Sequence, residues 1–201
     1  DDLAPVFAAQ GDMLAYFATV FGPYPFAIYG ALVTNGLGGL DFEAQTMSLF
    51  GGAVDEEIVA HELVHQWFGD SVSVRSWDAI WLAEGFATFG SWLWEEHQGG
   101  RTTAQRGRQA RRPDLGPIRD PGLDGMFDDN VYNRGALTLE ALRETIGDDA
   151  FFRTLSTYAA RFRGGNVTTD DFIAVAEQVS GRPLASFFAS WLDDATPPEL
   201  T

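Results

Sequence analysis

The feature that most constrains the fold of this chain is a pair of histidines four residues apart. His61 and His65 enclose Glu62 in the run His-Glu-Leu-Val-His. On an α-helix, side chains at positions i and i+4 lie on one face, so both imidazoles can reach a single ion. Acidic residues at 55–57 favour a helix that begins there and runs to about residue 68. The spacing therefore predicts a helix that carries half of a metal site.

Neutral imidazole is a preferred ligand of Zn²⁺, and catalytic zinc sites have three protein ligands with one open position. The candidate third ligand is Glu84, which follows His65 after eighteen residues and lies on the next predicted helix, residues 78–97. His97, the remaining histidine, ends that helix, and we expect it to be exposed to solvent. We predict one zinc ion per chain, held by the two paired histidines and Glu84. Glu62 would lie beside the ion, where it can take a proton from a bound water molecule.

The composition excludes several other classes of protein. The chain has 201 residues, of which 45% are hydrophobic and none is cysteine, so it is globular and lacks disulfides and thiolate metal sites. The net charge of −16 disfavours nucleic acid and anionic lipid as partners. No apolar run reaches the roughly 18 residues that membrane insertion requires. The compartment stays open, with a bacterial exported or cell-envelope location slightly favoured over the cytoplasm.

The order of the predicted elements indicates an α+β fold, with a small N-terminal β part and a mainly helical C-terminal part. The β-containing part is residues 1–53, and the zinc-binding helical part is residues 54–201. The predicted strands are residues 26–33 and 45–50. The other predicted helices are residues 3–21, 131–146, 148–161, 169–179 and 183–192. The turn-rich stretch at 113–130 is expected to lack regular structure.

Two longer runs extend the motif. HELVHQWFGDSV, followed by WDAIWLAEGFATF, resembles the zinc signature of the aminopeptidase N family, the gluzincin metallopeptidases with a thermolysin-like catalytic domain. The resemblance implies His61, His65 and Glu84 as zinc ligands. It implies Glu62 as the general base. Further matching positions are Trp67, Phe68, Gly69, Trp77, Trp81, Leu82, Gly85 and Phe86.

A later segment, residues 130–136, resembles the Tyr-x-Lys/Arg-Gly-Ala element of the same family. The resemblance implies that Tyr132 donates a hydrogen bond to the tetrahedral oxyanion, a role that suits a preorganised, uncharged phenol. The chain departs from the family at Ser91, where many members have a carboxylate, and at Ala83, where asparagine is common. Because the groups that orient metal ligands can alter metal affinity about 10–100-fold, these departures bear on zinc affinity.

Residues 38–46 are similar to the segment that makes members of this family exopeptidases. Matching its Gln-Thr dipeptide places the carboxylate that binds the substrate amine at Glu43, with Asp41 as a rival. A free α-ammonium group requires such a carboxylate near the zinc. Gly38 and Gly39 would let the substrate backbone approach the strand edge closely. The alternative is that this segment is a plain turn before a strand.

Together these features predict a zinc-dependent aminopeptidase that hydrolyses the N-terminal bond of peptides through a zinc-activated water, with Glu62 as general base. One alternative is a zinc endopeptidase, if Glu43 does not cap the site. Another is an inactive zinc-bound binding or assembly module. The chain begins at Asp1 and Asp2 without Met or a leader, and the family's N-terminal β-domain is missing. We therefore expect residues 1–201 to be the thermolysin-like catalytic domain of a larger protein.

Overall fold

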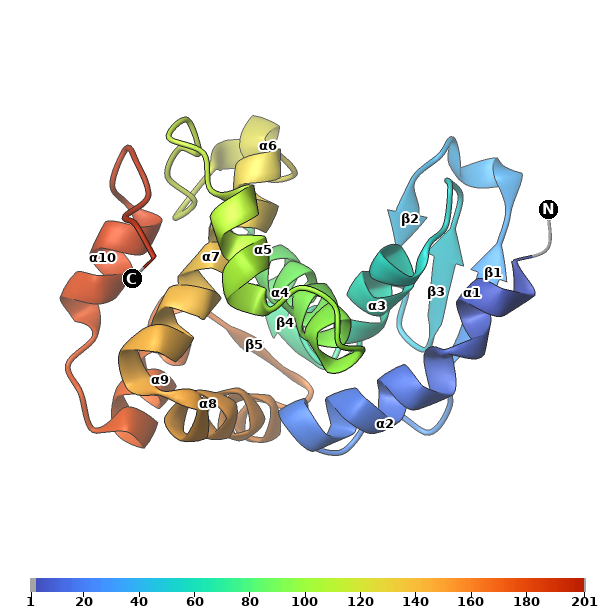
Figure 1. Cartoon of the computed structure of the whole chain (residues 1–201), viewed down its shortest axis with the longest axis horizontal. Coiled ribbons are helices and arrows are strands. Elements are labelled where there is room, and N and C mark those ends of the chain that lie inside the picture. Colours follow the sequence, from blue (N-terminus) through green and yellow to red (C-terminus); the bar gives the residue numbers. More distant parts are fainter. Residues whose placement is uncertain (1–2, 201) are drawn as a thin grey trace.

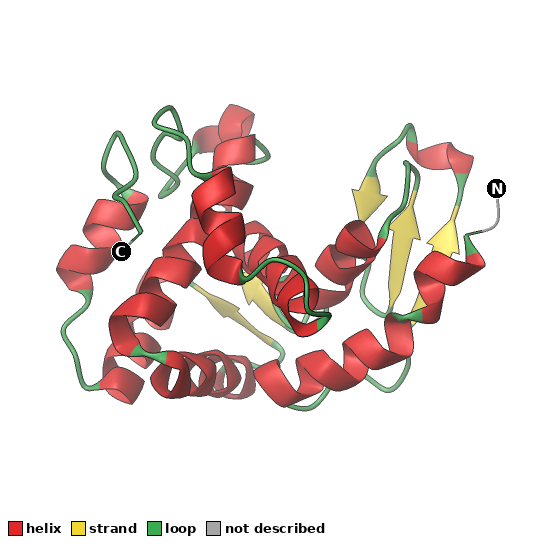
Figure 2. Ribbon diagram, in the orientation of Figure 1, coloured by secondary structure: helices red, strands yellow, loops and turns green. Residues whose placement is uncertain are grey.

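The computed structural model describes residues 3–200, so the predicted chain start at Asp1 and Asp2 lies outside the described residues. A lobe formed by a small sheet and the first helices lies beside a larger helical part (Figure 1). Strands occur in two separate places, one in each part (Figure 2). The α+β class and its order, a small β part followed mainly by helices, are confirmed. Among residues 3–200, no helix is both long and apolar enough to cross a bilayer.

The first lobe has two α-helices, one 3-10 helix and a three-stranded sheet. Its elements are α1 (Ala4–Ala8), α2 (Gln10–Phe21), β1 (Gly30–Val33), the 3-10 helix η1 (Asn35–Leu37), β2 (Asp41–Phe42) and β3 (Met47–Phe50). The strand order is β1-β3-β2; β1 is parallel to β3 and β2 is antiparallel to it. In register, Gly30 lies opposite Met47, and Asp41 lies opposite Phe50. The short strand β2 is therefore an edge of this sheet.

The strand predicted at residues 26–33 begins only at Gly30. The residues before it form a turn that the Tyr24 hydroxyl closes by donating a hydrogen bond to the Ile28 carbonyl at 3.0 Å. Pro25 lies within this turn and has no backbone N–H to donate to a strand ladder. The apolar run from 26 to 33 is thus partly turn and partly strand.

The helical part contains the helices predicted between residues 54 and 201, and it also has a second, two-stranded sheet. Its elements are α3 (Glu56–Val64), β4 (Val72–Val74), η2 (Trp77–Ala79), α4 (Trp81–His97), α5 (Thr103–Ala110), α6 (Gly122–Gly125), α7 (Asp129–Ile146), α8 (Asp148–Arg161), β5 (Gly165–Val167), α9 (Thr169–Ser180) and α10 (Ala185–Leu192). Strands β4 and β5 pair in parallel. They were not predicted, because each has only three residues and its partner is about ninety residues away along the chain. The short helix α6 lies in the stretch expected to be irregular.

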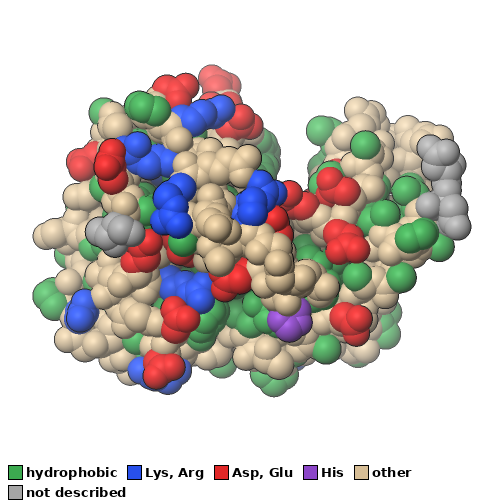
Figure 3. Space-filling view, viewed as in Figure 1, with side chains coloured by type: hydrophobic (Ala, Val, Ile, Leu, Met, Phe, Trp, Pro, Cys, Tyr) green, Lys and Arg blue, Asp and Glu red, His purple; other side chains and the backbone are tan. Residues whose placement is uncertain are grey.

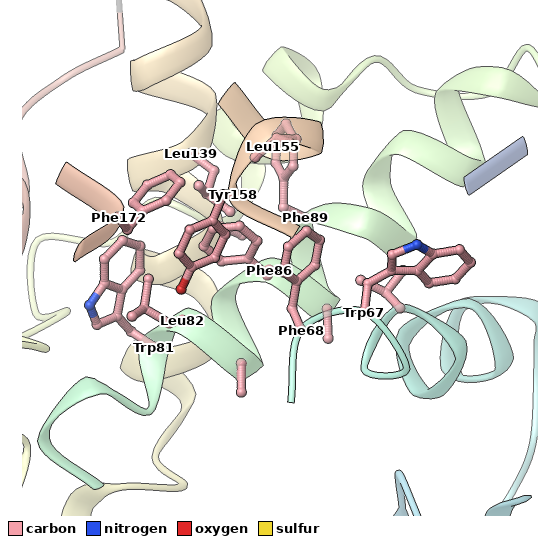
Figure 4. Close-up of a cluster of buried hydrophobic side chains, with 14 of the residues drawn as sticks. Trp67, Phe68, Trp81, Leu82, Phe86, Phe89, Leu139, Leu155, Tyr158 and Phe172 are labelled. Carbon is pink, nitrogen blue, oxygen red and sulfur yellow. The ribbon is translucent and has the colours of Figure 1, made fainter. Parts of the chain in front are cut away.

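The core is centred on α4, which is buried along most of its length. Aromatic rings from several elements pack around Phe86, with ring centroids 4.6 Å from Phe68 and 5.1 Å from Phe172 (Figure 4). Helix α4 crosses α7 at Gly85 and Gly135, where the two backbones touch. A Cβ atom built on Gly85 would lie 2.7 Å from the Gly135 Cα. Only glycine allows the two helices to approach this closely.

Arg134 of α7 is fully buried and holds the end of α10. Its guanidinium donates to the carbonyls of Trp191 at 2.7 Å and Ser190 at 3.3 Å, and to that of Leu115 at 2.8 Å. The last carbonyls of a helix have no partner within the helix, and a cation there also complements the helix dipole. Arg134 therefore caps α10 and ties both α10 and the 113–121 loop to α7.

Candidate metal centre and active site

Residues close in sequence determine where helix α3 begins and ends. The Asp55 side chain caps its first turn by accepting a hydrogen bond from the Ile58 N–H at 2.9 Å. The helix ends at Val64, earlier than predicted, because the chain reverses around Gly69, whose φ is +139°. A Cβ atom on Gly69 would lie 3.1 Å from Nδ1 of His65, so a glycine keeps this ring in place.

The structure brings His61, His65 and Glu84 together. The two Nε2 atoms lie 3.2 Å apart, and each lies 3.4 Å from Oε2 of Glu84. Donors of a tetrahedral zinc site with Zn–N bonds of about 2.0–2.1 Å are separated by about 3.3 Å. The three atoms therefore already have the spacing of a zinc-ligand triad. Two nitrogens and one carboxylate oxygen also suit zinc chemically.

Local structure favours the arrangement of two of the three side chains, His65 and Glu84. Nδ1 of His65 lies 3.1 Å from the Phe68 carbonyl oxygen, so the tautomer with hydrogen on Nδ1 leaves the Nε2 lone pair facing the centre of the triad. Glu84 is in the first turn of α4, where the helix dipole favours a negative charge. The triad is thus assembled by the packing of α4 against α3.

Burial and mutual charge set the protonation of the triad. Burial lowers the pKa of His61, which keeps its imidazole neutral. Burial acts against ionisation of Glu84, but the neighbouring His65 and His61 outweigh it and hold the pKa of this carboxyl well below its usual range. Burial likewise opposes the charging of His65, yet the Glu84 carboxylate outweighs it and raises the His65 pKa to about 10. The Glu84 carboxylate therefore favours a positive charge beside Nε2 of His65, which a proton supplies without a metal and a metal ion would supply in its place.

Glu62 and Tyr132 lie next to the triad. Glu62 is only 7% exposed, and its Oε2 atom has no hydrogen-bond partner among residues 3–200. Burial raises the Glu62 pKa to about 8. The Tyr132 ring lies parallel to that of His61, with centroids 5.9 Å apart and an interplanar angle of 19°. Burial, followed by the charge of Glu84, raises the Tyr132 pKa, so the phenol keeps its proton.

A cleft of about 280 Å³ opens beside these groups. It lies in the hollow between the sheet lobe and the helical part, where acidic side chains gather (Figure 3). Its lining residues come from β2, α3 and its cap, α4 and α7, and they are Asp41, Asp55, Glu57, Ile58, His61, Glu62, Thr88, Ser91 and Tyr132. Glu62, Tyr132 and His61 thus line one open space.

The segment predicted to bind the substrate amine covers the turn before β2, β2 itself and the loop from β2 to β3, and Glu43 lies at the start of this loop. Gly38 and Gly39 are exposed with positive φ values of 64° and 90°, in the turn that leads into β2. Asp41 uses Oδ1 to accept hydrogen bonds from the N–H groups of Gly51 at 2.9 Å and Gly52 at 3.4 Å. Burial raises the pKa of Glu62, and the nearby negative charges of Glu43 and Asp41 add to this rise.

Gln66 is a residue of this site that the sequence analysis did not single out. Its buried side-chain carbonyl accepts a hydrogen bond from the Thr46 N–H at 2.7 Å, and its amide donates to the Glu43 carbonyl at 3.3 Å. Thr46 has a φ of +66°, which is uncommon for a residue other than glycine. Gln66 therefore fastens the segment that carries Glu43 to the end of α3. The available signal was a polar residue directly after His65 in an apolar stretch.

The other residues noted in the sequence have simpler positions. His97 is exposed, as expected, and stacks on Tyr16 with ring centroids 4.0 Å apart. Ser91 lines the cleft, and its hydroxyl donates to the Thr88 carbonyl at 2.8 Å. Ala83 is buried in α4.

Comparisons with known proteins agree with this geometry. Residues 42–191 match the model of the peptidase family M1 domain. Aminopeptidase M1-A of Oryza sativa subsp. japonica is 33% identical over 150 residues, which are 67% of this chain and 17% of that protein. Leucyl aminopeptidase of Saccharolobus solfataricus is 32% identical over 151 residues, which are 68% of this chain and 19% of that protein. The chain thus spans less than a fifth of the length of these relatives.

A crystal structure of an M1 zinc metallopeptidase from Deinococcus radiodurans superposes with a TM-score of 0.86 at 34% identity. The match covers 95% of this chain and 45% of that one. Because the family model covers most of the chain and includes the triad, Glu62 and Tyr132, the chain belongs to peptidase family M1, the family of zinc aminopeptidases that its motifs resemble.

Proposed function

We propose that this chain is the catalytic part of a zinc aminopeptidase, which hydrolyses the first peptide bond of peptide substrates. The observation that carries the proposal is the zinc-like spacing of the His61, His65 and Glu84 donors. Beside them lies Glu62, whose Oε2 atom has no hydrogen-bond partner in the described part of the chain. When bound by these three ligands, zinc supplies Lewis acidity toward the scissile carbonyl and lowers the pKa of water. Relatives named aminopeptidases support this assignment.

Glu62 and Tyr132 have separate roles in the proposed reaction. Glu62 accepts the proton of the attacking water and passes it to the leaving amine. Its burial disfavours the charged form, so the carboxylate is a stronger base than one in water. Tyr132 donates a hydrogen bond to the oxyanion that develops at the scissile carbonyl. Its raised pKa keeps the donor hydrogen in place.

Glu43 is the proposed partner of the substrate α-ammonium group, in preference to Asp41. Oδ1 of Asp41 already accepts hydrogen bonds from the N–H groups of Gly51 and Gly52. The side chain of Glu43 has no such role among residues 3–200, and Gln66 holds the Glu43 backbone beside α3 by donating a hydrogen bond to its carbonyl. A carboxylate at this place restricts the enzyme to substrates with a free N-terminus. Gly38 and Gly39, with open space around them, leave the approach to β2 unobstructed.

The test is turnover of a panel of aminoacyl reporter substrates by protein with a measured zinc content. We expect about one zinc per chain, hydrolysis of the reporters, and loss of both after treatment with a chelator. Zinc bound without turnover of any substrate would favour an inactive binding or assembly module.

A second comparison separates aminopeptidase from endopeptidase action. The wild-type protein should cleave a free peptide and leave its N-acetylated form intact. Glu43→Ala should lose much of its activity on the free peptide, and Asp41→Ala is the matched variant for the rival carboxylate. Equal cleavage of free and acetylated peptides by the wild type would refute the aminopeptidase assignment and indicate an endopeptidase.

A further inference from the structure

The cleft beside the triad has an unusual balance of charge. Asp41 contributes a carboxylate from the sheet side, and Asp55 and Glu57 contribute two from the start of α3. No arginine is among the described side chains that line the cleft, and the sequence contains no lysine. Arg106 pairs with Glu57 from α5 and neutralises that carboxylate. The charges of Asp41 and Asp55 therefore determine the sign of the electrostatic potential in the cleft, which is negative.

Both aspartates keep one oxygen free for a ligand. Asp55 uses Oδ1 to cap α3, and Asp41 uses Oδ1 to hold the turn at 51–52. No hydrogen bond to the Oδ2 atom of either residue occurs among residues 3–200. A bound zinc ion brings two positive charges, but the carboxylates of Glu84 and Glu62 offset them at the triad. The cleft is therefore electronegative away from the triad.

More than an acidic patch is present here. Glu62 also lines the cleft, and its buried Oε2 atom has no hydrogen-bond partner among residues 3–200. Thr88 and Ser91 also line the cleft, and their small side chains leave room for a long one. Ile58 adds apolar surface to the lining, on which the methylene stem of an arginine or lysine can lie while its charged end reaches the aspartates.

The position of the cleft indicates which part of a substrate would occupy it. Under the proposed function, on which this step rests, Glu62 delivers a proton to the leaving amine. The residue that carries this amine is the second residue of the substrate, and it must therefore lie over Glu62. Glu43, the proposed partner of the first residue's amine, does not line the cleft. The side chain of the second residue thus has the cleft as its nearest space.

We infer that the cleft selects a basic side chain, arginine or lysine, at the second position of the substrate and disfavours an acidic one there. The half-buried Asp41 and the exposed Asp55 support a preference of roughly tenfold for arginine over glutamine, since each exposed ion pair contributes a few-fold. The preference should shrink at higher ionic strength, because salt screens exposed charges.

The experiment compares three peptides that share an N-terminal leucine and differ only at the second residue: Leu-Arg-Ala, Leu-Gln-Ala and Leu-Glu-Ala. Values of kcat/KM are measured for the zinc-loaded wild type and for Asp55→Asn and Asp41→Asn. Asparagine caps a helix about as well as aspartate does, so Asp55→Asn removes charge and keeps the cap. Asp149→Asn, at the exposed start of α8, changes the net charge equally at a distant place.

Leucine p-nitroanilide has no second amino-acid side chain and serves as the reference substrate. Each cleft variant should reduce the preference for arginine about threefold and leave hydrolysis of the reference nearly unchanged. Asp149→Asn should change neither. Equilibrium binding of the same peptides to the zinc-loaded Glu62→Gln variant gives a readout that is independent of turnover, and it should follow the same order.

Two results would count against these assignments in different ways. If the reference substrate is cleaved but the three peptides react within twofold of one another, the charge selection is wrong and the aminopeptidase assignment stands. A preference that Asp149→Asn reduces as much as Asp55→Asn would also overturn it. If no substrate is cleaved, the proposed function fails and the inference fails with it.

Discussion

The contact between Gly85 of α4 and Gly135 of α7 should be essential to the metal site, and Gly85→Ala tests this directly. The new Cβ would lie 2.7 Å from the Gly135 Cα and 2.8 Å from its carbonyl carbon. Carbon atoms pack best at about 3.5–4.0 Å, so the helices must separate by roughly 1 Å. Neither atom belongs to a side chain that can rotate away.

The net change in stability follows from two opposing effects. Overpacking a tight core costs about 1–3 kcal/mol, and a clash between backbones belongs at the upper end. Alanine is favoured over glycine within a helix by about 1 kcal/mol. We therefore expect Gly85→Ala to destabilise the protein by roughly 2 kcal/mol, which corresponds to a fall of about 4–8 °C in Tm for a chain of this size.

Zinc affinity should fall as well. Glu84 is the residue before Gly85, so a shift of α4 moves this ligand relative to the two histidines. We expect zinc to bind about tenfold more weakly or worse, by analogy with the loss of groups that orient ligands. Gly135→Ala creates the same clash from α7 and should destabilise the fold to a similar extent.

The assay is thermal unfolding of each variant in excess chelator and again with zinc, together with competition for zinc against a chromogenic chelator. Gly11→Ala is the matched control, because a Cβ on this α2 glycine meets nothing within 4 Å. It should raise stability by up to about 1 kcal/mol. If Gly85→Ala also raises Tm and keeps wild-type zinc affinity, the tight helix crossing does not position the triad.

Three further predictions concern single side chains. Glu62→Gln should keep about one zinc per chain but lose roughly 10²–10⁴ in kcat, and a loss of less than tenfold would contradict its role as base. Arg134→Met leaves three carbonyls unsatisfied and should lower the free energy of unfolding by about 3 kcal/mol or more, measured by urea denaturation, with Arg134→Lys less affected. Hydrogen bonds from Arg143 lower the pKa of Asp148 in the folded protein below its value in the unfolded chain. The pair therefore stabilises the fold at pH values above the unfolded pKa, and this contribution is lost as the pH falls through the folded pKa. Asp148→Asn should flatten the stability profile below about pH 4.5, and identical acid profiles for variant and wild type would rule this contribution out.

Local sequence determined the helical half of the site. His61 and His65 share a face because of helix geometry alone, and the next helix begins close enough in the chain for Glu84 to reach them. The fold class followed from the order of predicted elements, and family membership from the longer motifs around the ligands. The roles of Tyr132 and Glu43 came from the resemblance rather than from any local pattern, and they stay predictions.

Tertiary structure decided the features that depend on residues distant in sequence. The pairing of β4 with β5, the crossing of α4 and α7 at two glycines, and the capping of α10 by Arg134 each join segments separated by about fifty or more residues. The link from Gln66 to the segment carrying Glu43 spans about twenty residues. No periodicity or spacing signals such contacts, because each partner is ordinary in its own segment. The acidic cleft has the same origin: Asp41 and Asp55 become one electrostatic surface only when β2 and the start of α3 fold around the same space.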